Sequence, residues 1–342
     1  SQFNWTYDGT APTMTITAGG GVSDGDTSKD ATLALTFTSS EATTNFIKSD
    51  IVVAGGTLGD LSGSGTTYTA TFTPSASGAT TINVAGGTFT DAVGNNNTAA
   101  SEFNWTYDGT APTMTITAGG GVSDGDTSKD ATLALTFTSS EATTNFIKSD
   151  IVVAGGTLGD LSGSGTTYTA TFTPSGDGAT TIDVAASAFT DASGNNSTAA
   201  TQFNWTFDST APTISSVSLS AANTALTVTF SENVYDTTGG SGDLEAADFV
   251  VSKTGGTATV AATPTGISKN NASEWVLTLG ITGTANGSEV ITVNPASATS
   301  IYDVAANAAS TSQSNNTATF TEKVAPTMTI TAGGGVSDGD TS

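Results

Sequence analysis

The chain has 342 residues, of which 31 are acidic and 7 are basic, and its net charge is −24. It contains no cysteine and no histidine, which excludes disulfides, thiol chemistry and the commonest general base. The negative charge argues against binding to nucleic acid or to an anionic membrane surface. No apolar run approaches the ~20 residues of a membrane-spanning helix, and no signal peptide is visible. Without an activating base, no nucleophilic centre can be argued, so we expect no enzyme.

An internal repeat dominates the sequence. The tripeptide Ala-Pro-Thr recurs at spacings of 100, 100 and 114 residues, and segment 3–75 returns unchanged as 103–175. This period has the size of a whole domain rather than that of a solenoid repeat. The predicted units are the final strand of a preceding repeat (1–8), two near-identical repeats (9–108 and 109–208), a divergent repeat (209–324) and the start of a further repeat (325–342).

Apolar residues alternate with polar ones in seven short runs of the first full repeat. Leu33, Leu35 and Phe37 share one face of their run, as do Phe103 and Trp105 near the repeat's end. Such alternation between clusters of Gly, Ser, Asp and Asn is typical of a β-sandwich. The expected strands are 13–18, 31–38, 51–54, 57–61, 67–73, 80–85 and 102–107, with 51–54 and 57–61 forming a hairpin about Gly55-Gly56.

The third repeat keeps this pattern but carries an insertion. Leu226, Val228 and Phe230 alternate on one run, and Trp275 begins another. The insertion spans Thr237–Asp248, and its end is expected to form one short helical turn. The predicted fold class is all-β, consisting of tandem immunoglobulin-like antiparallel β-sandwich domains arranged as beads on a string.

Acidic residues are expected to gather where one repeat meets the next, because successive loops of an antiparallel sandwich alternate between its two ends. Loop 19–30 belongs to the far end, and the linker after the last strand leads to the near end of the following repeat. The first junction should collect Asp24, Asp26, Asp108, Glu141 and Asp191. The second should collect Asp124, Asp126, Asp208, Glu232 and Asp303, and the corresponding acids at the start of the first repeat are Asp8, Glu41 and Asp91.

Crowded carboxylates need a counter-ion. Two like charges ~4 Å apart repel by ~4 kcal/mol at an effective dielectric constant of ~20, and the chain has no arginine. Calcium takes oxygen ligands in flexible geometry, whereas zinc and copper favour nitrogen or sulfur. We therefore predict Ca²⁺ at the junctions. The alternative is that these acids are solvated loop residues that keep a β-rich chain soluble.

Three short motifs carry a family resemblance: the linker Asp108-Gly-Thr-Ala-Pro112, the strand end Phe230-Ser-Glu232, and Thr90-Asp-Ala-Val-Gly-Asn95 before the last strand. The chain resembles the bacterial immunoglobulin-like repeats of giant surface adhesins, including the extender domains of type I-secreted, repeats-in-toxin-type adhesins. The resemblance implies an extracellular, cell-surface stalk stiffened by calcium at its linkers. The exit linker of the third repeat, Glu322-Lys-Val-Ala-Pro326, departs from the pattern and is expected to bind calcium weakly or not at all and to act as a hinge.

Three functions are compatible with these patterns. The first is a structural extender of an adhesin, whose partners are neighbouring repeats and whose surface or glycan ligand is bound by other parts of the protein. The second is a self-assembling sheath, surface layer or filament held by lateral contacts between edge strands. In the third, the divergent repeat itself binds a glycan through its insertion and Trp275.

Overall fold

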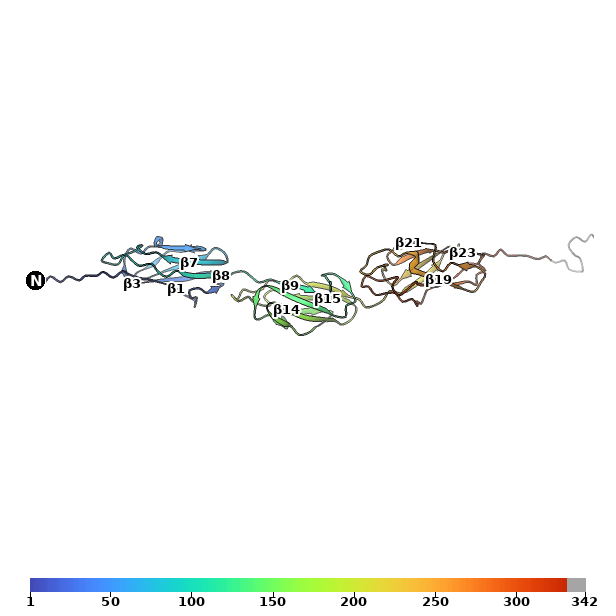
Figure 1. Ribbon diagram of the computed structural model, residues 1–342, viewed down its shortest axis with the longest axis horizontal. Coiled ribbons are helices and arrows are strands. Elements are labelled where there is room, and N and C mark those ends of the chain that lie inside the picture. Colours follow the sequence, from blue (N-terminus) through green and yellow to red (C-terminus); the bar gives the residue numbers. More distant parts are fainter. Residues whose placement is uncertain (331–342) are drawn as a thin grey trace, which may run out of the picture.

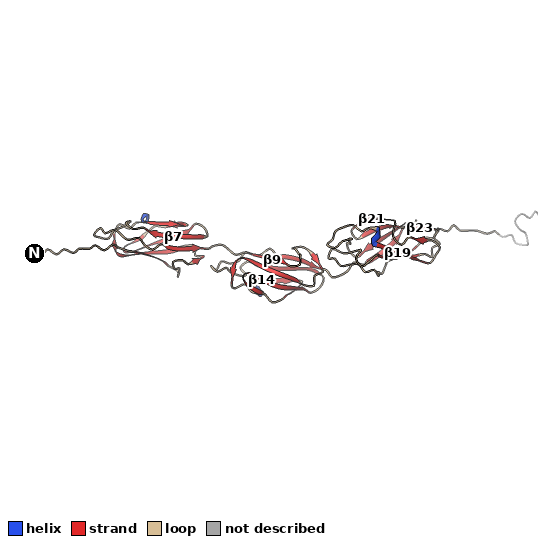
Figure 2. Cartoon of the chain, in the orientation of Figure 1, coloured by secondary structure: helices blue, strands red, loops and turns tan. Residues whose placement is uncertain are grey.

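The structure is a computed structural model that describes residues 1–330. Three β-sandwiches follow one another along the long axis, with the N-terminal residues extending from one end (Figure 1). Strands dominate, and the helices within residues 1–330 are three short 3₁₀ helices (Figure 2). These are η1 (Lys48–Asp50), η2 (Lys148–Asp150) and η3 (Ala246–Asp248). No helix in this part of the chain is long and apolar enough to cross a membrane.

The first sandwich consists of two four-stranded sheets, ordered β1-β3-β6-β5 and β2-β8-β7-β4. Pairing within them is antiparallel, except that β2 runs parallel to β8. The strands are β1 (Met14–Ala18), β2 (Thr27–Ser28), β3 (Leu33–Thr43), β4 (Ile51–Ala54), β5 (Gly56–Leu58), β6 (Ser62–Pro74), β7 (Gly78–Val84) and β8 (Phe103–Tyr107).

The second sandwich repeats this topology, with sheets β9-β11-β14-β13 and β10-β16-β15-β12. Its strands are β9 (Met114–Ala118), β10 (Thr127–Ser128), β11 (Leu133–Thr143), β12 (Ile151–Ala154), β13 (Gly156–Leu158), β14 (Ser162–Pro174), β15 (Gly178–Val184) and β16 (Phe203–Phe207).

The third sandwich has sheets ordered β17-β18-β22-β21 and β19-β24-β25, with a short β20-β23 pair. Its strands are β17 (Ile214–Leu219), β18 (Ala225–Phe230), β19 (Phe249–Thr254), β20 (Thr259–Val260), β21 (Gly266–Asn271), β22 (Glu274–Thr278), β23 (Ile281–Thr282), β24 (Val290–Pro295) and β25 (Thr317–Thr319). The expected helical turn at the end of the insertion is present as η3.

Each sandwich has its own core. Leu33, Leu35 and Phe37 on β3 face inward, and Phe37 is fully buried. The buried residues form three separate clusters, one in each sandwich. Burial of a side chain of this size stabilises a fold by ~1.5–3 kcal/mol, so the alternation fixes which face of each strand turns inward. Each repeat therefore has the means to fold around its own interior.

The predicted hairpin about Gly55 and Gly56 is wrong. The strand β4 pairs with β7, whereas β5 pairs with β6 in the opposite sheet. Gly55, with φ of +75°, turns the chain from one sheet to the other. A Cβ atom on Gly56 would lie 2.4 Å from both the Phe72 ring and the Thr73 carbonyl oxygen, so the crossing needs glycine.

The parallel pair β2–β8 was not predicted. It joins Thr27 to Thr106 and Ser28 to Tyr107, and it holds the preceding acidic loop against the side of β8. The hydroxyl of Ser28 accepts a hydrogen bond from the buried Trp105 indole at 3.1 Å. Two residues of strand are too short for their alternation to be read from sequence.

The terminal segments form no strand within the described residues. Phe3 and Trp5 repeat the sequence around Phe103 and Trp105, yet they are 91% and 74% exposed, against 4% and 1% for their counterparts. Residues 325–330 are likewise irregular, and 331–342 lie outside the described part of the chain. Assignment of these two segments to neighbouring repeats stays a prediction.

Candidate cation sites at the linkers

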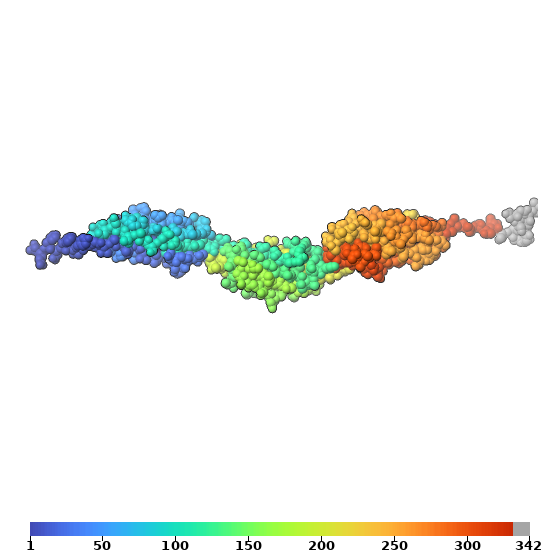
Figure 3. Space-filling view, viewed as in Figure 1, coloured from blue at the N-terminus to red at the C-terminus, as the bar shows by residue number. Residues whose placement is uncertain are grey.

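Three groups of three carboxylates lie at the N-terminal ends of the three sandwiches, which form three successive lobes in the space-filling view (Figure 3). In each group, one oxygen from every carboxylate lies within 4.8 Å of the others. We call these groups the linker trios. They are Asp8, Glu41 and Asp91; Asp108, Glu141 and Asp191; and Asp208, Glu232 and Asp303.

Each trio draws on three separate parts of a repeat. In the second repeat, Asp108 directly follows β8, Glu141 lies near the end of β11, and Asp191 opens a turn before the final strand. The turn is closed by Asn195, whose backbone N–H and side-chain amide donate to the two Asp191 carboxylate oxygens at 2.8 and 2.9 Å. The same amide donates to the Asp108 carbonyl oxygen at 2.9 Å. One asparagine thus fixes two members of the trio relative to each other.

The third repeat builds the same arrangement from a different turn sequence. Asn307 donates to both Asp303 carboxylate oxygens, at 2.7 and 2.8 Å, and to the Asp208 carbonyl oxygen at 2.9 Å. Asp303 is 0% exposed, compared with 7% for Asp91 and Asp191. The geometry therefore persists where the surrounding sequence has diverged, and the turn aspartate of the third repeat is more deeply buried than those of the first two.

The carboxylates of each trio perturb one another. Burial, followed by the charges of Asp303, Asp208 and Asp177, raises the pKa of Glu232 to about 7. Burial and the neighbouring aspartates likewise raise the pKa of Glu41 and of Glu141. In each trio, the glutamate is therefore the member whose ionised form is least well accommodated.

Hydrogen bonding sets the state of the turn aspartates. Burial would raise the pKa of Asp91, but hydrogen bonds from Asn95, Gly94 and Val93 outweigh it and lower the pKa below its usual value. At Asp303 the effect of burial prevails over the Asn307 hydrogen bonds, and the pKa is raised. The turn thus favours the ionised form of Asp91 in the first repeat and disfavours the ionised form of Asp303 in the third.

The donor set suits a hard divalent cation. Every candidate ligand is an oxygen, and calcium takes six to eight oxygens in flexible geometry. The ion pairs among residues 1–330 are Lys48–Asp60, Lys148–Asp160 and Lys269–Asp243, so no lysine pairs with a linker trio there. A bound cation would remove the mutual repulsion that the protein itself leaves uncompensated.

Asp24, Asp26, Asp124 and Asp126 were expected at the linker with the other acids, but they belong to none of the three linker trios. The Asp24 carboxylate accepts the Asn104 backbone N–H at 2.7 Å, and the Asp26 carboxylate accepts the Ser23 N–H at 2.7 Å. Asp124 and Asp126 make the same contacts in the second repeat. The β2–β8 and β10–β16 pairs hold these loops beside the last strand, so their acids bind backbone N–H groups of that strand or of the loop itself and join none of the three trios.

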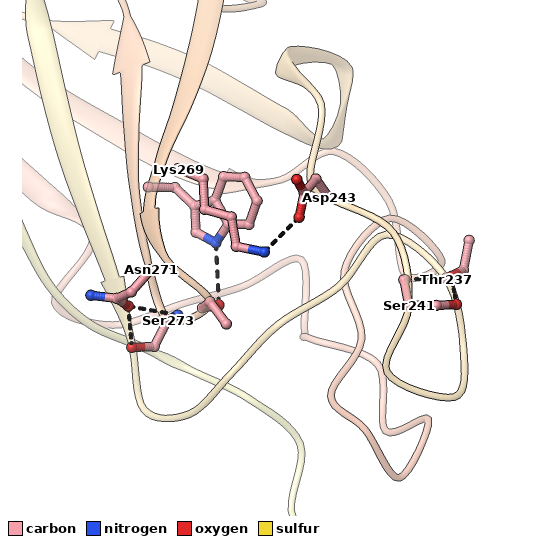
Figure 4. A network of polar contacts seen from close by, with 8 residues as sticks. Thr237, Ser241, Asp243, Lys269, Asn271 and Ser273 are labelled. Atoms are coloured by element: carbon pink, nitrogen blue, oxygen red, sulfur yellow. Dashed lines mark hydrogen bonds and ion pairs between the residues drawn. The ribbon is translucent and has the colours of Figure 1, made fainter.

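The insertion of the third repeat offers no exposed aromatic platform at Trp275. That side chain is 1% exposed and lies in the core, with Lys269 placed 5.1 Å above its ring. Lys269 also pairs with Asp243 of the insertion at 2.5 Å (Figure 4). Lys269 thereby links the insertion to the tryptophan, which is a core residue rather than an exposed binding platform.

Sequence reasoning missed several residues that contact the linkers. Ser77 and Asp177 bind the linker from the preceding repeat, and Lys29 donates to the carbonyl oxygen of Gly194 in the following one. A usable signal exists, because the two repeats that are identical over 73 positions diverge at residues 77/177 and 93/193, and the two linkers diverge at 109/209, all near the junctions. Spacing within one repeat could not expose it.

Comparison with known families identifies the repeats. A family model described as a bacterial Ig-like domain matches residues 8–107 and again residues 108–207. The two matches cover more than half of the chain, which therefore belongs to the family of bacterial Ig-like domains. The all-β sandwich fold and the resemblance to bacterial immunoglobulin-like repeats are confirmed. Because the matched repeats begin at Asp8 and Asp108, the first two linker trios each lie within a single repeat.

Two solved structures are similar to the chain. One is FdeC, an adhesin of Escherichia coli, with 13% identity, a TM-score of 0.35, and coverage of 93% of this chain and 98% of that one. The other is invasin, a bacterial integrin-binding protein, with 13% identity, a TM-score of 0.31, and coverage of 82% and 56%. A search of curated proteins finds no match.

Proposed function

We propose that this chain is a non-enzymatic extender segment of a large, repetitive cell-surface adhesin, stiffened by Ca²⁺ at its linkers. The observation that carries the proposal is the recurrence of a linker trio at the start of each of three successive sandwiches. The trio returns in the divergent third repeat, where much of the surrounding sequence has changed. Membership of the bacterial Ig-like family and the row of sandwiches in Figure 1 support an extended role outside the cell.

Calcium would act on both stability and shape. Extracellular calcium modules bind at ~10⁻⁴–10⁻³ M. A site filled at a hundredfold excess over its dissociation constant adds ~2.7 kcal/mol to the free energy of unfolding, against ~5–15 kcal/mol for a whole domain. Because each trio includes the first residue of a linker, the bound ion would also fix the direction in which that linker enters the next sandwich.

Calcium titration by isothermal calorimetry tests the proposal. We expect the full chain to bind calcium at the linker trios, and Asp191→Asn to remove one site because it takes a charge from the second trio. Asp160→Asn is the matched control, since Asp160 forms an exposed ion pair with Lys148 outside any trio. Asp124→Asn should also bind normally, because that carboxylate accepts the backbone N–H of Asn204 in β16 and belongs to no trio.

Two results would contradict the proposal. One is the absence of binding heat at millimolar calcium. The other is a stoichiometry that Asp191→Asn leaves unchanged. A loss of one site in Asp124→Asn would instead place the ion in the loop that the sequence first suggested.

A further inference from the structure

Each linker forms hydrogen bonds with the repeat that precedes it as well as with the repeat that follows it. The turn between β6 and β7 places the Ser77 hydroxyl 3.0 Å from the Gly109 backbone N–H and 3.1 Å from the Thr110 hydroxyl. At the second junction, the turn between β14 and β15 carries Asp177 at the equivalent position. The hydrogen bonds of Ser77 and Asp177 are made without any carboxylate of a linker trio, so they can form when no cation is bound.

The grip at the second junction is stronger. Asp177 accepts hydrogen bonds from the Ser209 backbone N–H at 2.9 Å and from the Ser209 hydroxyl at 2.8 Å, and a third comes from the Thr210 hydroxyl. These bonds lower the pKa of Asp177, so the carboxylate is ionised at neutral pH. Hydrogen bonds to an ionised acceptor are roughly twice as strong as those between neutral groups.

The two junctions also differ at residues 107 and 109, whose counterparts are residues 207 and 209, and these differences depend on each other. A Cβ atom on Gly109 would lie 2.3 Å from the Tyr107 hydroxyl oxygen, so the first linker needs either glycine or a shifted tyrosine. In the second linker, Phe207 lacks that hydroxyl, and Ser209 is accommodated. Glycine also leaves the first linker freer in the unfolded and loosened states than serine does. Ser77, Tyr107 and Gly109 thus form one compatible set, and Asp177, Phe207 and Ser209 form another.

At each junction, an equivalent lysine contact connects the two neighbouring repeats. Lys29 donates to the Gly194 carbonyl oxygen, and Lys129 donates to the Ala306 carbonyl oxygen at 2.5 Å. Both lysines are exposed, and such contacts contribute little individually. Because the two junctions share this contact, it does not distinguish them.

We propose that residues 77, 107 and 109, and their counterparts 177, 207 and 209, form cation-independent linker clamps of different strength, which make the second junction stiffer than the first. The inference rests on the extender function proposed above and adds a graded stiffness encoded in otherwise near-identical repeats. An array built in this way bends preferentially at its softer junctions when calcium is scarce.

The absence of cysteine allows a direct test on the full chain. Spin labels at Val52→Cys and Val152→Cys span the first junction, and labels at Val152→Cys and Val250→Cys span the second. These valines are 64%, 63% and 40% exposed. Dipolar spectroscopy in chelator gives the width of each interlabel distance distribution, which we expect to be roughly half as wide across the second junction as across the first.

Exchanging the clamps should exchange the widths. Ser77→Asp with Tyr107→Phe and Gly109→Ser should narrow the first distribution, and the reverse triple variant, Asp177→Ser with Phe207→Tyr and Ser209→Gly, should broaden the second. The first exchange keeps the test valid if the reverse variant loosens its own fold. Equal widths in chelator, or widths unmoved by the first exchange, would overturn the proposal. Calcium plays no part in this measurement. A negative result would therefore say nothing against the cation sites, and an absence of calcium binding would say nothing against the clamps.

Discussion

Replacing Trp205 with alanine is expected to unfold the second repeat selectively while the first and third stay folded. The Trp205 side chain is 1% exposed, packs edge-on against Phe172 with ring centroids 6.2 Å apart, and donates to the Ser128 hydroxyl at 3.0 Å. Truncation of a buried tryptophan costs ~3–5 kcal/mol, a large share of the ~5–15 kcal/mol that holds a domain. The three cores are separate clusters, so the loss should stay local.

Calorimetry combined with limited proteolysis measures this effect. The variant should show one early unfolding transition and cleavage confined to about the middle third of the chain. Trp5→Ala is the control, because Trp5 lies in a local sequence, Phe-Asn-Trp-Thr-Tyr, that differs from the segment around Trp205 only in its last residue, but Trp5 is 74% exposed. A single cooperative transition that moves for all three repeats would show that the sandwiches do not fold independently.

Calcium binding at the second junction is expected to weaken by about two orders of magnitude between pH 8 and pH 5. Glu232 has a pKa of about 7, raised first by burial and then by Asp303, Asp208 and Asp177. A proton competes with the cation for this carboxylate, so apparent affinity falls by about tenfold for each pH unit below that pKa. The background variant Asp91→Asn with Asp191→Asn leaves only this trio intact for titration.

The stability of the cation-free chain should show the opposite trend. The folded pKa of Glu232 lies above the unfolded value of 4.5, so the folded state binds the proton more tightly. The contribution of Glu232 to the stability of the third repeat should therefore be complete below pH 4.5 and be lost as pH rises through about 7, and calcium should restore what is lost. In Glu232→Gln the pH dependence in this window should disappear and calcium should bind weakly. Affinity that is constant from pH 5 to pH 8 would refute this account of the trio.

Hydrophobic alternation predicted most of the fold because it reports directly on burial. Strands such as β3 and β8 carry large apolar residues on one face, and the structure places those residues inside. Alternation does not say which sheet a strand joins, however. The change of sheet at Gly55 depends on a positive φ and on the close approach of Gly56 to Phe72, and neither leaves a periodic signal.

The candidate site was predicted in part for a similar reason. Counting strands correctly assigns Asp108, Glu141 and Asp191 to one end of a sandwich, because strand direction alone determines that end. The same counting misplaced Asp24, because the two-residue strand β2 pairs with β8 and ties its loop to Asn104. The clamp residues were missed because a serine in a turn has no distinctive spacing, and only the comparison of Ser77 with Asp177 reveals its role.

Small-angle scattering of the full chain in calcium and in chelator tests most directly the claim that cations at the linker trios stiffen the array. The account predicts a rod-like profile with a sharply defined maximum dimension in millimolar calcium, and a shorter, broader distribution after chelation. The triple variant Asp91→Asn, Asp191→Asn and Asp303→Asn should give the broadened profile even in calcium. A wild-type profile that chelation leaves unchanged would contradict the account and assign the acids to solvation alone.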